Sequence, residues 1–336
     1  MLSDIDILDA HVHVYRAERW NDTLDALRHT GAQQFVLLDT GHDGHDPHRQ
    51  QLELALRIKR TMLAGSAYVF GGLDFRGMFD HGRAEPDVPF EHQLQHLIDI
   101  GCDGLKLLAG KPDRRKAIGA ALDGDVFRPM LELAEQLGFP LLWHVGDPPE
   151  FWSERTAPRW ARQRGWFYDH THPPKSQLEA EIANVFRRHP RLRLILPHFF
   201  FLADRLDDAA RLLEAYPNYM LDLAPGVEMF HHFTARRDDA REFFVRFADR
   251  IIFGSDIGLG CGWSRDRGMM IRRFLETGDA IEVPDDPAMT PDDRPPLRGL
   301  SLPREVLRLI YAENFRRVVG PWRRVLAAEL SQSLSS

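Results

Sequence analysis

Cysteine is scarce in this chain, which has only two among its 336 residues, Cys102 and Cys261. They lie far apart and outside any metal-ligand spacing, so the sequence gives no sign of a disulfide framework or of a cysteine-based metal site. A chain of this length buries most of its unfolded surface and needs no such cross-links. We therefore expect a reduced, cytoplasmic compartment.

Three further absences narrow the class of protein. The first residues lack the basic segment and apolar run of a signal peptide. No stretch of about 18 apolar residues is available to span a bilayer. The formal net charge of −7 argues against a general affinity for nucleic acid or for an anionic membrane. We therefore expect a soluble protein with neither nucleic acid nor membrane as a partner.

What the chain does contain is a regular alternation of short β-rich runs and amphipathic helical stretches. Apolar residues at helical spacing are clearest at Val126–Leu137, Ser176–Arg188 and Ala203–Tyr216. Eight runs are candidate strands, namely Ile5–Val14, Gln34–Asp39, Ala67–Asp74, Gly104–Leu108, Pro140–Val145, Leu192–Pro197, Tyr219–Leu223 and Arg250–Gly254.

This alternation predicts a (β/α)₈ barrel of the TIM type. Parallel strands need helical connections, and continuous apolar strands need cover on both faces. An open doubly wound sheet is the alternative that the strand count leaves. No internal repeat, linker or low-complexity tract divides the chain, so we expect residues 1–336 to form a single domain.

Two long loops follow predicted strands, Gly146 to Lys175 after the fifth and Ile257 to Leu302 after the eighth. On a barrel, such loops lie on the active face. The first is rich in aromatic residues. It either covers the pocket, mediates contact in an oligomer or packs on itself.

His11 and His13 end the first predicted strand, in the segment DAHVH. Residues two apart in a strand point to the same side, so both imidazoles project into the mouth, the end of the barrel where the strands terminate. His144, His198 and Asp256 end the fifth, sixth and eighth predicted strands. Each alone can be a buried polar group, but burying all of them together is costly unless a cation or hydrogen bonds compensate. The set therefore predicts a metal centre.

The order of these motifs resembles the amidohydrolase superfamily: DAHVH, a strand-five histidine, PH on strand six and FGSD on strand eight. The segment YAENFRRVV is similar to the helix that closes such barrels. The resemblance spans residues 5–320 and is greatest to the branch named after aminocarboxymuconate-semialdehyde decarboxylase, whose members mostly hold one metal. It implies His11, His13, His144 and Asp256 as ligands and His198 as the acid–base residue.

These residues suit that chemistry. Three neutral imidazoles and a carboxylate leave a divalent ion with one net positive charge and an open position. Such an ion lowers the pKa of bound water from 15.7 toward about 7. Asp256 can then accept a proton as well as bind, and His198 can polarise a carbonyl or protonate a leaving group. We expect one divalent ion, Zn²⁺ first, with Mn²⁺, Fe²⁺ and Co²⁺ as alternatives.

Two cationic residues are candidates for binding substrate. Lys106 ends the fourth predicted strand, where two-metal branches of the superfamily carry a carboxylated lysine, so a binuclear centre stays open. We favour an unmodified Lys106 that binds a substrate carboxylate or carbonyl; a salt bridge inside the barrel is the structural alternative. Arg76 either holds an anionic substrate by a bidentate pair or pairs with Asp74.

Other polar residues near the ends of predicted strands are weaker candidates for a role in the site. The loop from Gly41 to His48 either contacts substrate or a second ion, or forms a turn before an N-capped helix. His170 and His172 repeat the HxH spacing in a loop, where convergence is not assured. We expect Asp9 to orient a ligand ring, and Asp222 to hydrogen-bond neighbouring loops.

Two reactions use this predicted centre. The first is hydrolysis of a C–O or C–N bond in a small carboxylated or cyclic substrate such as a lactone, ester or amide. The second is non-oxidative decarboxylation of a small aromatic or unsaturated carboxylic acid, with His198 protonating carbon. Hydrolysis comes first because it is the broader activity in the superfamily. A silent barrel would lack a ligand, and none is missing. We expect a small anionic substrate, and a homo-oligomer stays open.

Overall fold

The computed structural model describes residues 2–14, 20–41, 51–81, 83–226, 228–258, 265–285, 296–320 and 322. Eight parallel strands lie side by side in chain order: β1 (Leu8–His13), β2 (Gln34–Leu38), β3 (Ala67–Gly72), β4 (Gly104–Gly110), β5 (Leu141–Val145), β6 (Leu194–Leu196), β7 (Tyr219–Asp222) and β8 (Ile251–Ile252).

The sheet closes where β1 meets the segment that follows β8. The Ala10 N–H donates to Phe253 O at 3.0 Å, and the His13 N–H donates to Ile257 O at 2.9 Å. This closure confirms the predicted (β/α)₈ barrel and rules out the open sheet. We call this junction the seam.

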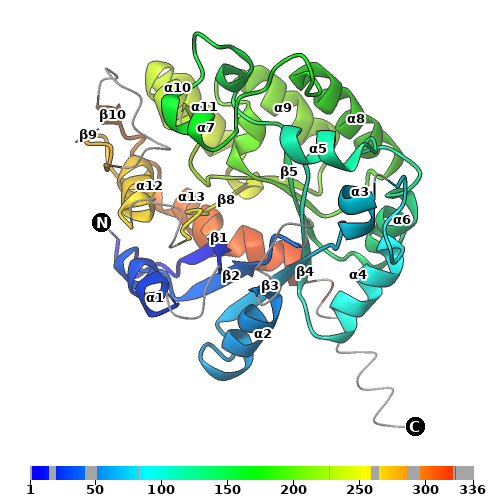
Figure 1. Ribbon diagram of the computed structural model, residues 1–336. Helices are drawn as coiled ribbons and strands as arrows, with labels where there is room; N and C mark the ends of the chain where they lie inside the picture. The colour runs from blue at the N-terminus through cyan, green and yellow to red at the C-terminus, as the bar shows by residue number, and fades with distance from the viewer. Residues whose placement is uncertain are drawn as a thin grey trace.

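Helices surround the strands (Figure 1). They are α1 (Trp20–His29), α2 (Gln51–Thr61), α3 (Arg76–His81), α4 (Phe90–Asp99), α5 (Pro112–Ile118), α6 (Arg128–Leu137), α7 (Arg159–Gln163), α8 (Lys175–Arg188), α9 (Leu206–Ala215), α10 (Met229–Ala235), α11 (Arg237–Arg246), α12 (Arg267–Glu276) and α13 (Arg304–Arg308). The three helices expected from apolar spacing are present as α6, α8 and α9. Within the described residues, none of the helices is both long enough and apolar enough to cross a membrane.

Shorter elements also occur among the described residues. The 3₁₀-type turns there are η2 (Pro149–Trp152), η3 (His198–Phe201) and η4 (Ala248–Arg250), and β9 (Ala280–Ile281) pairs antiparallel with β10 (Leu297–Arg298). The π-helical turn η5 (Leu309–Glu313) extends α13 into a helix that runs to residue 320. The sequence also predicts a final helix at Trp322–Leu330, and apart from Trp322 these residues lie outside the part of the chain that the structure describes.

Two strands are shorter than predicted for identifiable reasons. β6 stops before Pro197, which has no N–H to donate to a ladder. β8 stops at Ile252 because the next N–H, that of Phe253, donates to Ile310 O in the terminal helix at 2.9 Å. The terminal helix therefore replaces a strand partner at this point.

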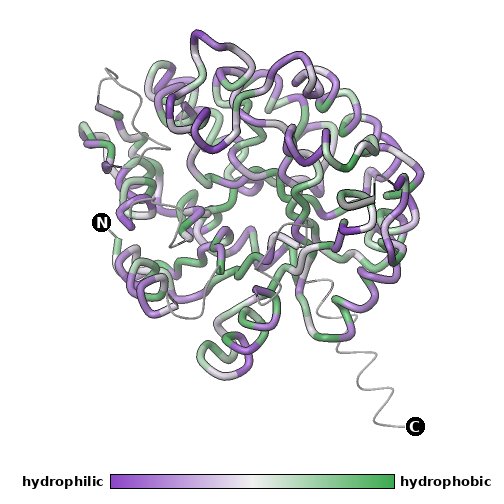
Figure 2. Tube along the Cα trace, viewed as in Figure 1, coloured by the Kyte–Doolittle hydropathy of each residue, from purple (hydrophilic) through white to green (hydrophobic). Residues whose placement is uncertain are grey.

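Apolar side chains fill the barrel interior. Those from the strands are Leu8, Ala10, Val36, Leu38, Tyr68, Phe70, Leu142, Ile195, Met220 and Ile252. Ala312, Phe315, Val318 and Val319 of the terminal helix join the same cluster, and Figure 1 shows this helix, in orange, lying across the middle of the barrel. Apolar residues that alternate with these in the strands pack outward against the helices, and Figure 2 shows hydrophobic stretches along the strands and mixed colours along the outer helices.

The insertion after β5, residues 146–174, has a small core of its own. Phe151, Ala161 and Tyr168 form a separate buried cluster, against which Trp152, Trp160 and Trp166 pack. Of the alternatives considered for its aromatic residues, self-packing is therefore observed. We call this segment the β5 insertion.

Asn314 ties the terminal helix to the barrel, because its Nδ2 donates to Ala248 O (2.8 Å) and Ile251 O (2.7 Å) in a buried position. We expect Asn314→Ala to lower the free energy of unfolding by about 2–3 kcal/mol, since two buried carbonyls lose their donor. Urea denaturation measures this. Glu313→Ala, which removes only an exposed ion pair with Arg308, is the matched control. Equal effects of the two variants would contradict the structural role of Asn314.

Candidate metal centre

A β-bulge in β1 turns its two histidines toward the mouth. Asp9 pairs with Phe35 of β2, but the next pair is Val12 with Leu37, so β1 carries one extra residue over this stretch. Ala10 belongs to the interior cluster, whereas Val12 packs in the outer one. The bulge reverses the alternation of side chains. As a result His11 and His13, rather than Val12, face inward.

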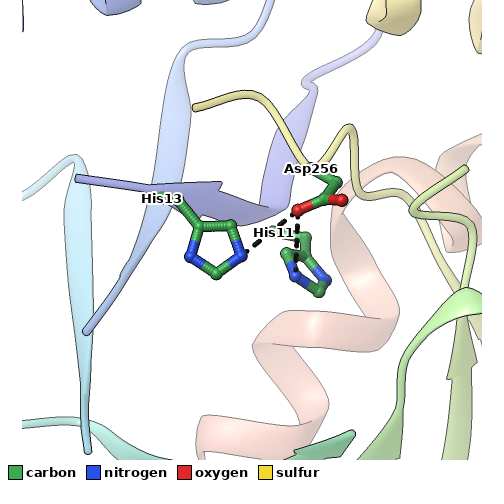
Figure 3. Close-up of side chains that lie close together, drawn as sticks. All are labelled: His11, His13 and Asp256. Carbon is green, nitrogen blue, oxygen red and sulfur yellow. Dashed lines mark ion pairs between the residues drawn. The ribbon is translucent and has the colours of Figure 1, made fainter. Parts of the chain in front are cut away.

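His11, His13 and Asp256 converge at the mouth. One candidate ligand atom from each lies within 4.8 Å of the other two, and all three residues are buried. His13 Nε2 lies 3.2 Å and His11 Nε2 3.5 Å from Asp256 Oδ1, and Figure 3 shows both rings beside this carboxylate. Two ligand atoms that bind one zinc ion at about 2.1 Å in tetrahedral geometry are about 3.4 Å apart. The spacing therefore fits a divalent metal ion.

Asp222 fixes the ring of His11. It ends β7, two residues after the interior Met220, and its Oδ2 accepts the Nδ1–H of His11 at 2.8 Å. The lone pair of His11 Nε2 is thus left facing Asp256, with Lys106 Nζ 3.3 Å away. Two electron-rich atoms facing each other in a buried site are stabilised by a cation.

Asp222 also does what the sequence predicted for it. Its Oδ1 accepts the backbone N–H groups of His198 (2.9 Å) and Ala224 (3.0 Å). Its contact with the His11 ring was missed. The signal was available in its position, because a carboxylate two residues beyond an inward-facing strand residue also faces inward.

Asp9 and Ser255 hold the seam together. Asp9 accepts the backbone N–H of Ser255 (3.0 Å) and of His11 (3.2 Å), and its second oxygen accepts the Ser255 hydroxyl at 2.5 Å. Burial raises the pKa of Asp9 to about 7. We expected Asp9 to orient a ligand ring; it instead holds the backbone that carries His11.

Asp256 is positioned by the seam and by a buried arginine. It adopts a left-handed φ of 55°, and its N–H donates to His11 O at 2.8 Å. Arg267 at the start of α12 is completely buried, and its Nη1 lies 3.6 Å from Asp256 Oδ2. Sequence reasoning missed Arg267, because Arg265, Asp266 and Arg272 lie close to it in the sequence and nothing local distinguishes it from them.

Burial controls protonation in this group. It lowers the pKa of His13 and, together with Lys106, the pKa of His11. Burial alone would raise the pKa of Asp256, but the hydrogen bond with His13 and the nearby His11 hold it well below its ordinary value. The group therefore offers neutral imidazoles and a carboxylate, which are donors that zinc accepts.

His198 stands on an unusual turn. His198, Phe199, Phe200 and Phe201 all have φ between 52° and 56°, a left-handed turn that costs L-residues roughly 1 kcal/mol each. Phe199 is completely buried, with Phe233 at 4.9 Å and Phe243 at 5.5 Å between ring centroids. This packing offsets the strain and fixes the backbone that carries His198.

The ring of His198 has a defined tautomer. Its Nδ1 lies 3.0 Å from Ala224 O, and a carbonyl only accepts, so Nδ1 carries the proton and Nε2 keeps its lone pair. Burial, with His144 nearby, lowers the pKa of His198 to about 4. The ring centroid lies 5.5 Å from that of His11. The structure thus places the predicted acid–base residue beside the converging ligands.

His144 lies in the next position around the mouth but does not belong to the converging group. Its ring packs edge-on against His198, with centroids 4.9 Å apart. Its Nε2 donates to Gly146 O at 2.9 Å and lies 3.2 Å from Asp147 Oδ1, which leaves the lone pair on Nδ1. A role for His144 as the fourth ligand stays a prediction.

The structure places the two predicted substrate-binding cations differently. Lys106 is buried at the centre, and burial lowers its pKa to about 8 against the opposing effect of Asp256. Among the described residues it forms no salt bridge, so the predicted structural alternative is not observed. Arg76 forms a bidentate pair with Asp74, with Nε 3.0 Å from Oδ1 and Nη2 2.5 Å from Oδ2. Its contact with substrate stays a prediction.

The weaker sequence candidates do not add ligands. Residues 42–48 lie outside the described residues. His170 is exposed, and His172 Nδ1 lies 2.9 Å from Asp169 Oδ1. Within the part of the chain that the structure describes, His11, His13 and Asp256 form the one set of three potential ligands that converge.

Comparison with protein families gives a match over most of the chain. The model of the amidohydrolase family matches residues 8–320, a span that includes every residue of the centre. This confirms the resemblance read from the motifs. Comparison with curated proteins gives no match.

Solved structures share the fold at low sequence identity. An uncharacterised TIM-barrel protein from Bordetella bronchiseptica is 12% identical, with a TM-score of 0.60 over 95% of this chain and 99% of that one. A zinc-bound amidohydrolase from Burkholderia multivorans is 14% identical, with a TM-score of 0.57 over 94% and 99%. A dihydroxybenzoic acid decarboxylase from Polaromonas sp. JS666, with bound manganese and an inhibitor, is 13% identical, with a TM-score of 0.53 over 94% and 97%.

We expect the protein to bind one divalent ion per chain, because a single set of ligand atoms converges among the residues that the structure describes. Metal analysis of dialysed protein measures the content. His11→Ala and Asp256→Ala should lose the ion, whereas Lys106→Met should keep it. A content of two ions, one of them lost in Lys106→Met, would instead show a binuclear centre.

Asp222→Asn should weaken zinc binding by about 10–100-fold, because the amide replaces the carboxylate that holds the His11 ring. Competition with a chromophoric chelator measures this affinity. Asp207→Asn, an exposed change in the first turn of α9, is the control. Unchanged affinity in Asp222→Asn would show that His11 does not need this partner.

Proposed function

This chain belongs to the amidohydrolase family, and from that premise we propose that it is a metal-dependent hydrolase of a small anionic substrate. The bond cleaved is a C–O or C–N bond, as in a lactone, an ester or an amide. The observation that carries this proposal is the tautomer of His198, whose Nδ1–H is held by Ala224 O and whose Nε2 is therefore a proton acceptor.

His11, His13 and Asp256 would hold the ion, and His144 would complete the set through Nδ1. A divalent ion held there polarises a substrate carbonyl and lowers the pKa of a water molecule. Zinc is the proposed metal because imidazole nitrogen and carboxylate oxygen are its usual partners. Manganese, iron and cobalt accept the same donors, so metal supply also decides the occupant.

His198 acts as the proton carrier in this proposal. As the water oxygen bonds to the acyl carbon, Nε2 of His198 accepts a proton from the water. The bond from that carbon to the leaving oxygen or nitrogen then breaks, and Nε2 returns the proton to the leaving atom. The ring ends in the neutral state in which it began, with Nδ1–H still held by Ala224. Asp256 is the second acceptor, and the hydrogen bond with His13 and the nearby His11 favour its ionised carboxylate by holding its pKa low.

Lys106 is the proposed contact for the substrate's anionic group. Its Nζ lies beside His11 Nε2, so a group bound to it lies next to the reacting bond. Arg76 is less suited to this role, because Asp74 already accepts its guanidinium in a bidentate pair.

The His198 tautomer also bears on the alternative reaction, decarboxylation. Replacing a carboxylate by hydrogen requires a proton delivered to carbon, and Nε2 of the neutral ring would first have to take up that proton from another donor. Hydrolysis needs the proton taken up before it is released, which this tautomer allows. This difference favours hydrolysis.

The test is a panel of lactones, esters, amides and aromatic carboxylic acids, supplied to zinc-loaded and manganese-loaded protein. Acid release is followed with a pH indicator, and carbon dioxide is measured separately. We expect hydrolysis, lowered at least about 100-fold in His198→Gln with the metal content unchanged. His92→Gln, an exposed substitution on α4, should behave as wild type. Carbon dioxide release without acid release would establish the decarboxylase instead.

A further inference from the structure

We propose that Asp147, Lys111 and Tyr168 form a buried positioning network through which the β5 insertion orients the ring of His144 at the metal centre. The inference rests on the proposed function, in which His144 is the fourth ligand. It assigns a role to the insertion, which the reaction itself does not use.

The three residues come from two segments that meet beside His144, because Asp147 and Tyr168 both belong to the β5 insertion. Lys111 follows β4, Asp147 follows β5, and Tyr168 lies near the end of the β5 insertion. Asp147 Oδ2 accepts from Lys111 Nζ at 2.5 Å and from the Tyr168 hydroxyl, and Lys111 Nζ lies 3.2 Å from that hydroxyl. Asp147 Oδ1 faces His144 Nε2 at 3.2 Å. All four residues are buried.

The polar atoms of this network are matched to one another. A buried carboxylate is costly unless charge and hydrogen bonds compensate it. Asp147 meets a cation, a hydroxyl and an imidazole, so both of its oxygens are satisfied. Lys111 in turn stands over the ring of Trp166, with its Nζ 4.1 Å from the centroid. Tyr168 and Trp166 of the β5 insertion thus hold Lys111 in place, and Lys111 in turn holds Asp147.

The packing of the insertion determines where Tyr168 lies. The Tyr168 N–H donates to Phe151 O at 2.9 Å, and both residues belong to the insertion's own hydrophobic cluster. The insertion is therefore a folded unit, and its internal packing places the Tyr168 hydroxyl on Asp147.

The consequence falls on the ring of His144. Asp147 and Gly146 O both engage Nε2, so Nε2 carries the proton and Nδ1 presents the lone pair. A carboxylate on the far nitrogen also makes the ligating nitrogen a stronger donor. Without Tyr168 or Lys111, Asp147 loses a partner and its hold on the ring loosens.

A second contact, made by Lys175 at the start of α8, supports the same ring through Phe201. Lys175 Nζ lies 3.4 Å from Asp147 O and 5.2 Å from the centroid of Phe201. The Phe201 ring in turn packs against His144, with centroids 5.7 Å apart. The histidine is thus held at Nε2 by the network and along its side by an aromatic wall.

The experiment measures metal binding, which requires no substrate. Zinc affinity is determined by chelator competition, and the ligand field by the visible absorption of Co²⁺-substituted protein. We expect Asp147→Asn to weaken zinc binding about 10–100-fold and to change the Co²⁺ spectrum. Tyr168→Phe, which removes one oxygen from a packed ring, should shift both readouts in the same direction by a smaller amount and should still fold.

Glu181→Gln is the matched control. Glu181 also accepts a largely buried bidentate pair, from Arg115 with Nη2 2.8 Å and Nε 2.9 Å away, but on the helical side of the barrel. Glu181→Gln should lower the melting temperature without changing the zinc affinity or the Co²⁺ spectrum.

If Asp147→Asn and Tyr168→Phe behave as this control does, the network is only structural and the inference is wrong, while the proposed hydrolase is untouched. If both variants shift zinc affinity but the wild-type protein hydrolyses no substrate, the positioning network is supported and the proposed hydrolase is wrong. Wild-type protein that binds no zinc, cobalt or manganese would overturn both.

Discussion

The seam between β1 and the segment after β8 is the constraint on which the metal centre depends. It joins two parts of the chain that are far apart in sequence, and it does so with main-chain bonds reinforced by Asp9 and Ser255. The same bonds that close the barrel place Asp256 beside His11 and His13. Fold stability and ligand spacing therefore share one set of contacts.

Three imidazoles near this seam each donate one N–H to a fixed acceptor and keep one lone pair. His11 donates to Asp222, His198 to Ala224 O and His144 to Gly146 O. The acceptors are two backbone carbonyls and one buried carboxylate, so they have little freedom to move. This arrangement prepares the nitrogens in advance, which lowers the cost of organising them around a cation or a proton.

Much of this could be predicted from the sequence, because the barrel's periodicity and the residues that end its strands are local signals. The strand-end rule placed His11, His13, His198 and Asp256 at one mouth. It could not reveal the bulge in β1. Whether two residues of β1 lie opposite one residue of β2 depends on the neighbouring strand and not on the sequence of β1 alone. The left-handed turn at His198 was equally hidden, since phenylalanines give no sign of positive φ and only tertiary packing sustains it.

The sequence also could not show which residues far apart in the chain contact one another in the folded protein. Asp9, Asp222 and Arg267 are each buried beside the centre, yet the sequence does not say whether a carboxylate bonds a ring, a backbone amide or an arginine. Arg76 is a case in which the partner is local, because Asp74, two residues away, occupies the guanidinium that was predicted to bind substrate.

The terminal helix has a further consequence for how such a centre works. Phe315, Val318 and Val319 pack in one interior cluster with Leu8 and Ala10 of β1, the strand that also carries His11 and His13. Protein interiors are densely packed, so a change of side-chain volume in this helix is transmitted to its neighbours. The terminal helix therefore bears on the backbone of the metal centre as well as on the stability of the barrel.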